Sequence, residues 1–309
     1  MSDSPSLQEL IEVQRHFGLP NMALVEKDWY VVKALAAITS VDATPFRLVF
    51  GGGTALSRAH RFSRRMSEDI DLKIIADDNT PRSAFRQLRD EVTGALLKAG
   101  FSFNPDDPKQ RESANASRYT LYHLPYLPIT AGVGVLRPEI QIETAVWPLR
   151  RPAVERSVIS FIAEAFKRPA EVPAISCVSI AETAAEKFVA LTRRAGAEQA
   201  GAGGPRDPTL VRHIYDLHVI RREVDPADVI DLAQTIILAD VEAYGHQFPA
   251  YRDNPVGETL RAVAGLREDL GYRRRYENFL RDMVYGETAE FAEALATVVG
   301  LAECLSLRK

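Results

Sequence analysis

The spacing of apolar residues predicts helices at the start of the chain. Leu7, Leu10 and Val13 recur at near-helical spacing before the Gly18-Leu19-Pro20 break, which predicts a first helix there. Similar spacing predicts a second helix over residues 23–38. Another helix is predicted over residues 82–99, ending at Gly100.

Short apolar or alternating runs between these helices predict β-strands. The run at residues 46–50 ends in Gly51-Gly52-Gly53, which predicts a strand entering a tight turn. Thr54 follows, a residue type favoured at helix N-caps, so a short helix is predicted over residues 55–61. Further strands are predicted at residues 69–75, 119–124 and 139–146.

From about residue 153 the pattern becomes helical. Seven helices are predicted there, over residues 157–166, 180–194, 210–221, 227–238, 255–270, 274–284 and 289–305. Residues 195–208 are small and polar, which predicts a long loop or a partly disordered insertion. We therefore expect an α/β (α+β) domain with a short mixed sheet flanked by helices over residues 1–150, and an all-helical domain over residues 151–309.

Composition narrows the classes of function. With 42 acidic and 38 basic residues among 309, the formal net charge is −4, so any nucleic-acid binding must come from local basic patches. Two distant cysteines, Cys177 and Cys304, form neither a disulfide framework nor a zinc site, which fits a reducing, cytoplasmic setting. The polar N-terminus has no signal-peptide layout, and no apolar run approaches the ~18 residues of a membrane span.

Asp69 and Asp71 lie two positions apart in the predicted strand at residues 69–75. Side chains two apart on a strand share a face, so both carboxylates point together while Ile70 and Leu72 point into the opposite layer. Two carboxylates on one face repel each other unless a positive charge lies between them. A hard divalent cation such as Mg²⁺ removes this cost, so the two aspartates are candidate metal ligands.

The glycine turn at residues 51–53 lets the backbone approach an anion closely. Backbone N–H groups at Thr54 and the start of the next helix would then face phosphate oxygens. A phosphate cradle beside an acidic pair predicts a site for a metal-bound triphosphate, in which attack on the α-phosphorus is oriented. Acidic pairs and glycine turns are each common as solvated strand edges or ordinary turns, so the specific signal is their order along the chain.

Four segments of the chain resemble one protein family. The stretch GGGTALSRAHRFSRRMSEDIDL resembles the G-G-T/S … R-x-S-x-D-x-D signature of the AbiEii/MenT-like nucleotidyltransferase toxins, within the DNA polymerase β-like nucleotidyltransferase superfamily. VEKDWYV at residues 25–31, AEKFVAL at residues 185–191 and HIYDLHVI at residues 213–220 are similar to further elements of that family. The resemblance implies a nucleotidyltransferase domain followed by a helical domain that completes the NTP cleft.

The resemblance also implies roles for single residues. Gly52, Gly53 and Thr54 would hold the triphosphate, and Asp69 and Asp71 would bind Mg²⁺ or Mn²⁺. Ser67 matches the serine two places before the first aspartate, and would hydrogen-bond a phosphate or orient the loop.

Three further catalytic residues follow from the same resemblance. Glu143 in EIQIETAV is the candidate third carboxylate, which would join the metal site or deprotonate the incoming hydroxyl; the alternative is a solvent-facing edge residue. Lys187 would pair with the β- or γ-phosphate of the NTP. Asp216 would orient Lys187 or assist proton removal, unless it forms a surface ion pair with Arg212 or Arg221.

Two positions depart from the family pattern. Arg58 stands where relatives often have lysine; it would still bind phosphate, but as a planar fork. His213 stands where an aspartate is expected, and Asp207 is a candidate spatial substitute. The charged run Glu26-Lys27-Asp28 is interpreted as a surface-exposed turn, with bracing of the active-site cleft by Lys27 or Asp28 as the alternative.

Arginines cluster at several places and suggest the acceptor. The clusters are Arg58, Arg61, Arg64 and Arg65, then Arg193, Arg194, Arg221 and Arg222, then Arg273, Arg274 and Arg275. Arginine forks suit phosphate backbones, and Tyr272 and Tyr276 are candidates for stacking on bases; the alternative is a solvated helix face.

The family implies an RNA acceptor, with the tRNA 3′ end as target class, and a cognate antitoxin, often a winged-helix protein. We keep two alternatives: transfer to a protein hydroxyl or a small molecule, and a non-catalytic nucleotide-binding module. The sequence has neither H-E-x-x-H nor G-x-S-x-G, which disfavours zinc and serine hydrolases.

Overall fold

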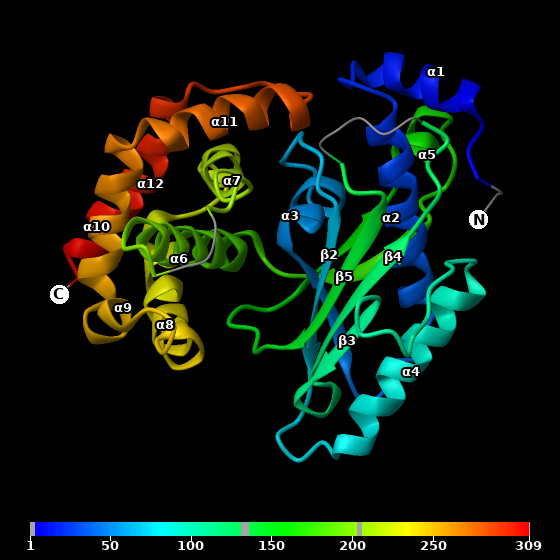
Figure 1. The fold of residues 1–309 in the computed structure, drawn as a ribbon, viewed down its shortest axis with the longest axis horizontal. Helices are drawn as coiled ribbons and strands as arrows, with labels where there is room; N and C mark the ends of the chain where they lie inside the picture. Colours follow the sequence, from blue (N-terminus) through cyan, green and yellow to red (C-terminus); the bar gives the residue numbers. More distant parts are fainter. Residues whose placement is uncertain (1–3, 131–135, 203–205, 309) are drawn as a thin grey trace. The chain divides into compact units, whose positions relative to one another are not determined.

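The protein is described here from a computed structural model that covers residues 4–130, 136–202 and 206–308. The chain divides into two compact units, Met1–Val178 and Ser179–Lys309. Figure 1 shows strands and helices in the first unit and helices in the second.

The first unit alternates helices and strands along the chain. Its elements are α1 (Leu7–Phe17), α2 (Ala23–Thr39), β1 (Arg47–Gly51), α3 (Gly52–Thr54), the π-helical turn η1 (Ala55–Ala59), β2 (Asp69–Ile75), α4 (Arg82–Lys98), β3 (Arg111–Ala114), the 3-10 turn η2 (Asn115–Ser117), β4 (Tyr119–Pro125), β5 (Glu139–Val146), β6 (Val154–Val158), α5 (Phe161–Ala165) and β7 (Val172–Cys177).

Within the described residues, seven strands form one mixed sheet in the order β3-β4-β5-β2-β1-β7-β6. The central strand β2 pairs antiparallel with β1 and parallel with β5. The expected fold class, a mixed sheet with flanking helices, is therefore confirmed.

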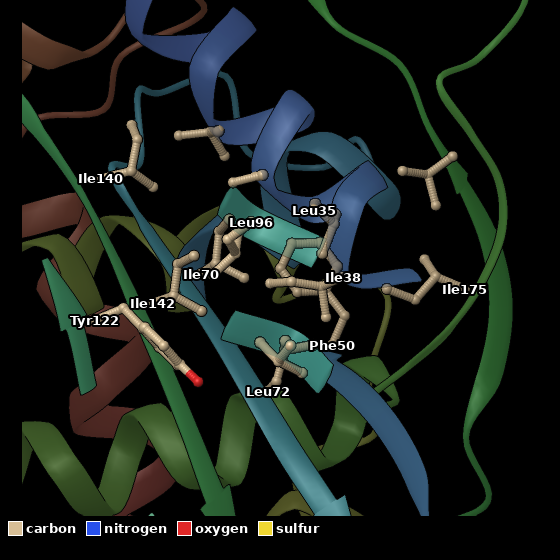
Figure 2. Packing of buried hydrophobic residues seen from close by; sticks show 14 of the residues in the cluster. Leu35, Ile38, Phe50, Ile70, Leu72, Leu96, Tyr122, Ile140, Ile142 and Ile175 are labelled. Carbon is tan, nitrogen blue, oxygen red and sulfur yellow. The ribbon is translucent and has the colours of Figure 1, made fainter. Parts of the chain in front are cut away.

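One face of this sheet carries the core of the unit. Ile70, Leu72 and Ile74 of β2 are buried, whereas the alternate residues of the strand are partly exposed. The apolar face packs against buried residues of α2 and α4, among them Leu35 and Leu96 (Figure 2). Because side chains alternate along a strand, the polar residues of β2 lie on the face opposite this core.

The second unit is helical throughout the residues described. Its helices are α6 (Ile180–Gln199), α7 (Arg212–Ile220), α8 (Pro226–Tyr244), α9 (Pro249–Asp253), α10 (Pro255–Glu268), α11 (Leu270–Met283) and α12 (Phe291–Ser306). The long helix α6 contacts α7, α8 and α10 (Figure 1). No helix in the described part of the chain is both long enough and apolar enough to cross a bilayer.

The structure differs from the sequence-based expectation around residue 150. The predicted helix at residues 157–166 is in part strand β6, and β7 was not predicted. The two strands pair with each other, and β7 also pairs with β1, so this segment completes the sheet. The boundary between units therefore lies at Val178 rather than near residue 150, because sheet pairing holds the segment to the first unit.

The predicted loop at residues 195–208 is also helical in its first part. Helix α6 continues to Gln199, with Ala195 and Gly196 buried. At Gly196 an added Cβ would lie 3.2 Å from the Phe248 ring and 3.5 Å from Ala262 Cβ. The small residues that suggested a flexible loop thus allow α10 to pack closely on α6.

Candidate functional site

The glycine bend and the acidic strand lie directly against each other. Gly51, the last residue of β1, pairs with Asp71 of β2. Gly52 has a φ of +69°, and a Cβ on Gly52 would overlap the Asp71 carboxylate. The Thr54 hydroxyl donates a hydrogen bond to the main-chain carbonyl of Asp69. The two features, which are at least 15 positions apart in the sequence, are therefore neighbours in space.

Asp69 and Asp71 share the polar face of the sheet with residues of β5. In the parallel ladder Asp69 pairs with Gln141, and Asp71 pairs with Glu143. Residues paired in register project to the same side, so Glu143 lies on the same face as both aspartates. All four residues are partly exposed. The sequence prediction placed Glu143 on a later strand, and the structure makes that strand the immediate neighbour of β2.

Arg65 and Ser67 cover the glycine bend at Gly53. A Cβ on Gly53 would lie 2.8 Å from Ser67 Oγ and would overlap the Arg65 guanidinium. Both side chains are buried, and Arg65 Nη1 donates to the Met66 carbonyl at 2.9 Å. A guanidinium and a hydroxyl next to a glycine backbone form surroundings suited to an anion. Arg65 was noted in the sequence only as part of a cluster, because many arginines surround it.

Arg137 pairs with the first aspartate. Its Nη2 lies 2.7 Å from Asp69 Oδ1, and its Nη1 donates to Gln141 Oε1 at 2.8 Å. Arg137 was not predicted as a site residue, because it stands 68 positions from Asp69 in a run without a recognisable signal. The positive charge that two neighbouring carboxylates require is thus supplied in part by this guanidinium.

The acidic face fits a metal that arrives with a triphosphate. Magnesium keeps several waters and is bound through one or two carboxylates plus phosphate oxygens, so Asp69 and Asp71 suffice on the protein side. No group of three or more His, Cys, Asp or Glu residues that could hold an ion occurs within residues 4–130, 136–202 and 206–308. Glu143 lies beside Asp71 in the ladder, and its two predicted roles, as a metal ligand or as a general base, both stay predictions.

The surroundings of Glu143 change the proton affinity of its carboxyl group. Burial raises the pKa of the Glu143 carboxyl, and the nearby negative charge of Asp69 raises it further, while a hydrogen bond with Tyr119 opposes the shift. A carboxylate with a raised pKa holds a proton more readily, which is what a general base needs.

The charged run Glu26-Lys27-Asp28 is buried, so the interpretation as a surface-exposed turn is wrong. The three residues lie in the first half of α2 with exposed fractions of 1%, 0% and 2%. Each has partners in distant parts of the chain, which explains why charges occur in an otherwise apolar helix. Buried charges are tolerated only when they are paired and hydrogen-bonded.

Lys27 connects α2 to the segments that carry Asp69 and Arg137. Its ammonium donates to the main-chain carbonyls of Arg137, at 2.7 Å, and of Glu139. It also lies 3.2 Å from Glu68 Oε1, and Glu68 accepts a hydrogen bond from the Arg137 amide at 3.1 Å. Burial lowers the pKa of Lys27, and the Glu68 carboxylate opposes that shift. Glu68, which directly precedes the first residue of β2, is thus bound to α2 through Lys27.

Asp28 holds Arg58. Its Oδ1 lies 2.6 Å from Arg58 Nε, and its Oδ2 accepts a hydrogen bond from the Phe161 amide at 2.7 Å. The Arg58 guanidinium lies over the Phe161 ring, 3.7 Å from its centroid. These contacts position the guanidinium within the first unit, and nucleotide binding by Arg58 stays a prediction.

Glu26 holds the segment that follows β4. Its carboxylate accepts hydrogen bonds from the amides of Ile129, at 2.6 Å, and Thr130, at 3.2 Å, and from the Thr130 hydroxyl at 2.7 Å. Three successive residues of one helix therefore fix several distant chain segments of the first unit.

In the second unit, Lys187 and Asp216 form a buried ion pair. Lys187 Nζ on α6 lies 2.8 Å from Asp216 Oδ2 on α7, and the side chains are 7% and 0% exposed. The burial of Asp216 excludes the alternative of a surface ion pair, and its predicted role in orienting Lys187 for catalysis stays a prediction. Asp207, the candidate substitute for the missing aspartate, pairs with Arg194 and accepts hydrogen bonds from Thr209.

The aromatic residues proposed to stack on bases are enclosed in the second unit. Tyr272 and Tyr276 are both 0% exposed, so the prediction that they stack on an acceptor is wrong. They lie on the apolar side of α11. Several clustered arginines have acidic partners, as in the pairs of Arg193 with Asp240, Arg194 with Asp207, Arg273 with Glu277 and Arg275 with Glu198. These pairs reduce the net positive charge that the clusters offer.

Comparison with known proteins agrees with this geometry. Residues 33–297 match the sequence profile of the family described as "Nucleotidyl transferase AbiEii toxin, Type IV TA system". No curated protein matches the chain significantly. Among solved structures, the chain is similar to MenT4, a nucleotidyltransferase toxin from Mycobacterium tuberculosis H37Rv, with a TM-score of 0.53 and 18% identity over 96% of this chain and 98% of that one.

At 18% identity, the similarity to MenT4 supports the fold alone. The profile match supports the family, because it extends over most of the chain. The matched region includes β1, the glycine bend, the acidic strand, β5 and the Lys187–Asp216 pair. The chain therefore belongs to the AbiEii family of nucleotidyl transferase toxins of type IV toxin–antitoxin systems.

Proposed function

We propose that this toxin transfers a nucleoside monophosphate from an NTP to an RNA, with the tRNA 3′ end as the preferred acceptor, in a reaction that requires Mg²⁺ or Mn²⁺. The observation that carries the proposal is the position of Asp69 and Asp71 on one face of β2, against the glycine bend. The family supplies the reaction class and implies an NTP and an antitoxin as partners.

In this proposal the residues of the first unit bind the triphosphate and orient it. Asp69 and Asp71 hold the divalent ion, which when bound neutralises charge on the phosphates. Gly52 and Gly53 let the phosphates approach the backbone, and the Ser67 hydroxyl donates a hydrogen bond to them. Thr54 acts through its hydrogen bond to the Asp69 carbonyl, which fixes the start of β2 against the bend.

Glu143 acts as the general base. The acceptor hydroxyl gives its proton to the Glu143 carboxylate while its oxygen forms a bond to the α-phosphorus. The bond from the α-phosphorus to the bridging oxygen breaks, and pyrophosphate leaves with the electron pair. The position of Glu143 beside Asp71 in the ladder supports this role.

Lys187 is proposed to bind the β- or γ-phosphate, with Asp216 orienting its ammonium. The 2.8 Å pair supports the orienting role, because an ammonium on a four-carbon stem otherwise samples many positions. We expect the pair to persist when nucleotide is bound, since Asp216 is completely buried.

Label transfer tests the reaction. Purified protein is incubated with each α-labelled NTP, Mg²⁺ and total RNA, and the RNA is separated by size. Labelled tRNA is the expected product, and Asp69→Ala/Asp71→Ala should abolish it. Absence of transfer with every NTP, or full transfer by the double variant, would contradict the proposal.

The acceptor has a second candidate, a protein hydroxyl or a small molecule. Two observations favour it. Several of the clustered arginines are paired with acidic residues, and Tyr272 and Tyr276 are buried. Fewer side chains are therefore available to bind RNA than the sequence suggested. The same labelled NTPs, offered with cell protein or small-molecule extract in place of RNA, distinguish the two acceptors.

We also propose that the toxin acts in the cytoplasm and that its cognate antitoxin is a winged-helix transcription regulator. Co-expression with the neighbouring gene product should restore growth that the toxin arrests, and Asp69→Ala/Asp71→Ala should make the rescue unnecessary. Failure of a winged-helix neighbour to restore growth would exclude this class of antitoxin.

A further inference from the structure

Arg137 combines an anchored main chain with an exposed charged group. Its amide donates to Glu68 Oε1 at 3.1 Å, and its carbonyl accepts from Lys27 Nζ at 2.7 Å. Its guanidinium, by contrast, is on the polar face, where it binds Asp69 and Gln141 with a side chain that is 42% exposed. The backbone position of Arg137 thus depends on α2, whereas its charged end binds partners that are partly exposed.

The partner of this guanidinium is a candidate metal ligand. Arg137 Nη2 and a divalent ion would bind the same Asp69 carboxylate, so the two compete for it. An ion pair at a partly exposed position stabilises little, so a divalent ion can displace the guanidinium. The released fork has the geometry to bind a phosphate in two contacts, as it does a carboxylate.

We propose that Arg137 is a triphosphate-binding residue that exchanges the Asp69 carboxylate for a phosphate of the incoming NTP. The inference rests on the proposed function, because it assigns a further residue to the same site. In this scheme Asp69 turns from the guanidinium to the metal, and Arg137 turns from Asp69 to a phosphate oxygen. The exchange leaves neither side chain without a charged partner. The metal ion would pair with the Asp69 carboxylate, and a phosphate of the nucleotide would pair with the Arg137 guanidinium.

The exchange predicts opposite effects on two affinities. Replacing Arg137 with glutamine frees Asp69, so binding of a divalent ion without nucleotide should become tighter. The same replacement removes a charged donor to phosphate, so binding of nucleotide should become weaker. A residue that only stabilises the fold would lower both affinities or leave both unchanged. Because the main chain at Arg137 is held by Lys27 and Glu68, the variant should fold.

The test uses the full chain and three variants. Arg137→Gln removes the charge, Arg137→Lys keeps the charge without the fork, and Arg47→Gln is the matched control. Arg47 is an exposed arginine at the opposite end of β1, paired with Ile75 rather than with an acidic residue in the ladder. Mn²⁺ affinity is measured without nucleotide by electron paramagnetic resonance. Affinity for non-hydrolysable analogues of the four NTPs with Mg²⁺ is measured by calorimetry, and circular dichroism checks the fold.

We expect Arg137→Gln to bind Mn²⁺ about five-fold more tightly, the size of one exposed ion pair. We expect it to bind the preferred analogue at least about ten-fold more weakly, the size of one charge-assisted hydrogen bond. Arg137→Lys should lie between the wild type and Arg137→Gln for the analogue. Arg47→Gln should match the wild type in both measurements.

Two failures are distinguishable. If the wild type binds the ions and the analogue but Arg137→Gln does not move the two affinities in opposite directions, the inference about Arg137 is wrong and the proposed function stands. If the wild type binds neither Mn²⁺ nor any analogue, the proposed function fails and the inference fails with it.

Discussion

The Asp71 carboxylate occupies the space that a side chain on Gly52 would need. Gly52 also has a φ of +69°, a backbone conformation that L side chains rarely adopt. The glycine therefore serves two purposes, because it permits the bend and leaves room for the Asp71 carboxylate. A substitution at this position tests the site without removing any polar group.

We predict that Gly52→Ala lowers the rate of transfer by at least about 100-fold, because the methyl group displaces Asp71 by the order of an ångström. The left-handed backbone adds a destabilisation of about 1–2 kcal/mol. Label transfer measures the rate, and urea unfolding measures the free energy of unfolding.

The matched control for this substitution is Gly94→Ala in the middle of α4. An added Cβ there meets no atom within 4 Å, so the protein should keep its activity and gain up to about 1 kcal/mol of stability. Full activity in Gly52→Ala would show that the position of Asp71 against the bend is unimportant.

Glu143→Gln should separate chemistry from binding. Glutamine keeps the size and the position in β5 but cannot accept the proton, so we expect transfer to fall by about 100- to 10,000-fold. Affinity for a non-hydrolysable NTP analogue with Mg²⁺ should stay within about three-fold of the wild type, because a general base acts in the transition state and does not hold the bound nucleotide. A large loss of analogue affinity would instead indicate that Glu143 helps to hold the metal.

The buried pair of Lys187 and Asp216 predicts a difference between stability and activity. Asp216→Asn leaves the Lys187 ammonium, which is 7% exposed, without its carboxylate, and should cost about 3–5 kcal/mol of unfolding free energy. Lys187→Met should cost a similar amount, because it leaves the Asp216 charge buried. Replacing both residues, in Lys187→Met/Asp216→Leu, should recover most of the stability.

Activity should not recover with stability in that double variant. If Lys187 binds phosphate, transfer stays at the level of Lys187→Met, although urea unfolding shows a stable protein. Recovery of transfer would mean that the pair serves the structure of the second unit alone.

The pKa of Asp28 predicts a pH dependence of stability. Burial raises this pKa to about 6 from the usual 3.8, although the Arg58 charge opposes the shift. Because the folded state holds the proton more tightly than the unfolded state, this carboxyl stabilises the fold at low pH. The contribution is complete below about pH 3.8 and is lost as the pH rises through about 6.

Asp28→Asn should lack this dependence. Between pH 4.5 and pH 7, the free energy of unfolding of the wild type should fall relative to that of Asp28→Asn by about 2 kcal/mol. Urea unfolding at the two pH values measures the difference, with Asp78→Asn as the control at an exposed position. A constant difference across this range would show that Asp28 is ionised throughout and that Arg58 dominates its environment.

Parts of the fold with a strong local pattern could be predicted from the sequence. The strand at residues 69–75 and the strand at residues 139–146 match β2 and β5 to the residue. Both alternate polar and apolar side chains with a period of two, which a strand requires when only one face is buried. The edge strands β3 and β6 and the strand β7 beside β6 were missed, because their short segments show weaker alternation and are recognised as strands only once they pair with a neighbour.

The polar contacts around the site could not be predicted from local sequence patterns. Burial of Glu26, Lys27 and Asp28 was not expected, because charges next to one another in a helix usually face water. Their partners, such as Glu68 and Phe161, lie tens of residues away or more, so no local pattern indicates that the charges are satisfied. The Asp69–Arg137 pair was missed for the same reason.

The sequence by itself determined which side chains of β2 share a face, and that a glycine bend ends the strand before it, because these properties depend on backbone geometry over a few residues. Only the tertiary structure decided that Glu143 stands beside Asp71, that Lys187 pairs with Asp216 and that Arg137 binds Asp69. Those contacts depend on strand register and helix packing between distant segments, and the free energy that selects them comes from burying the apolar residues on the opposite side of the same elements.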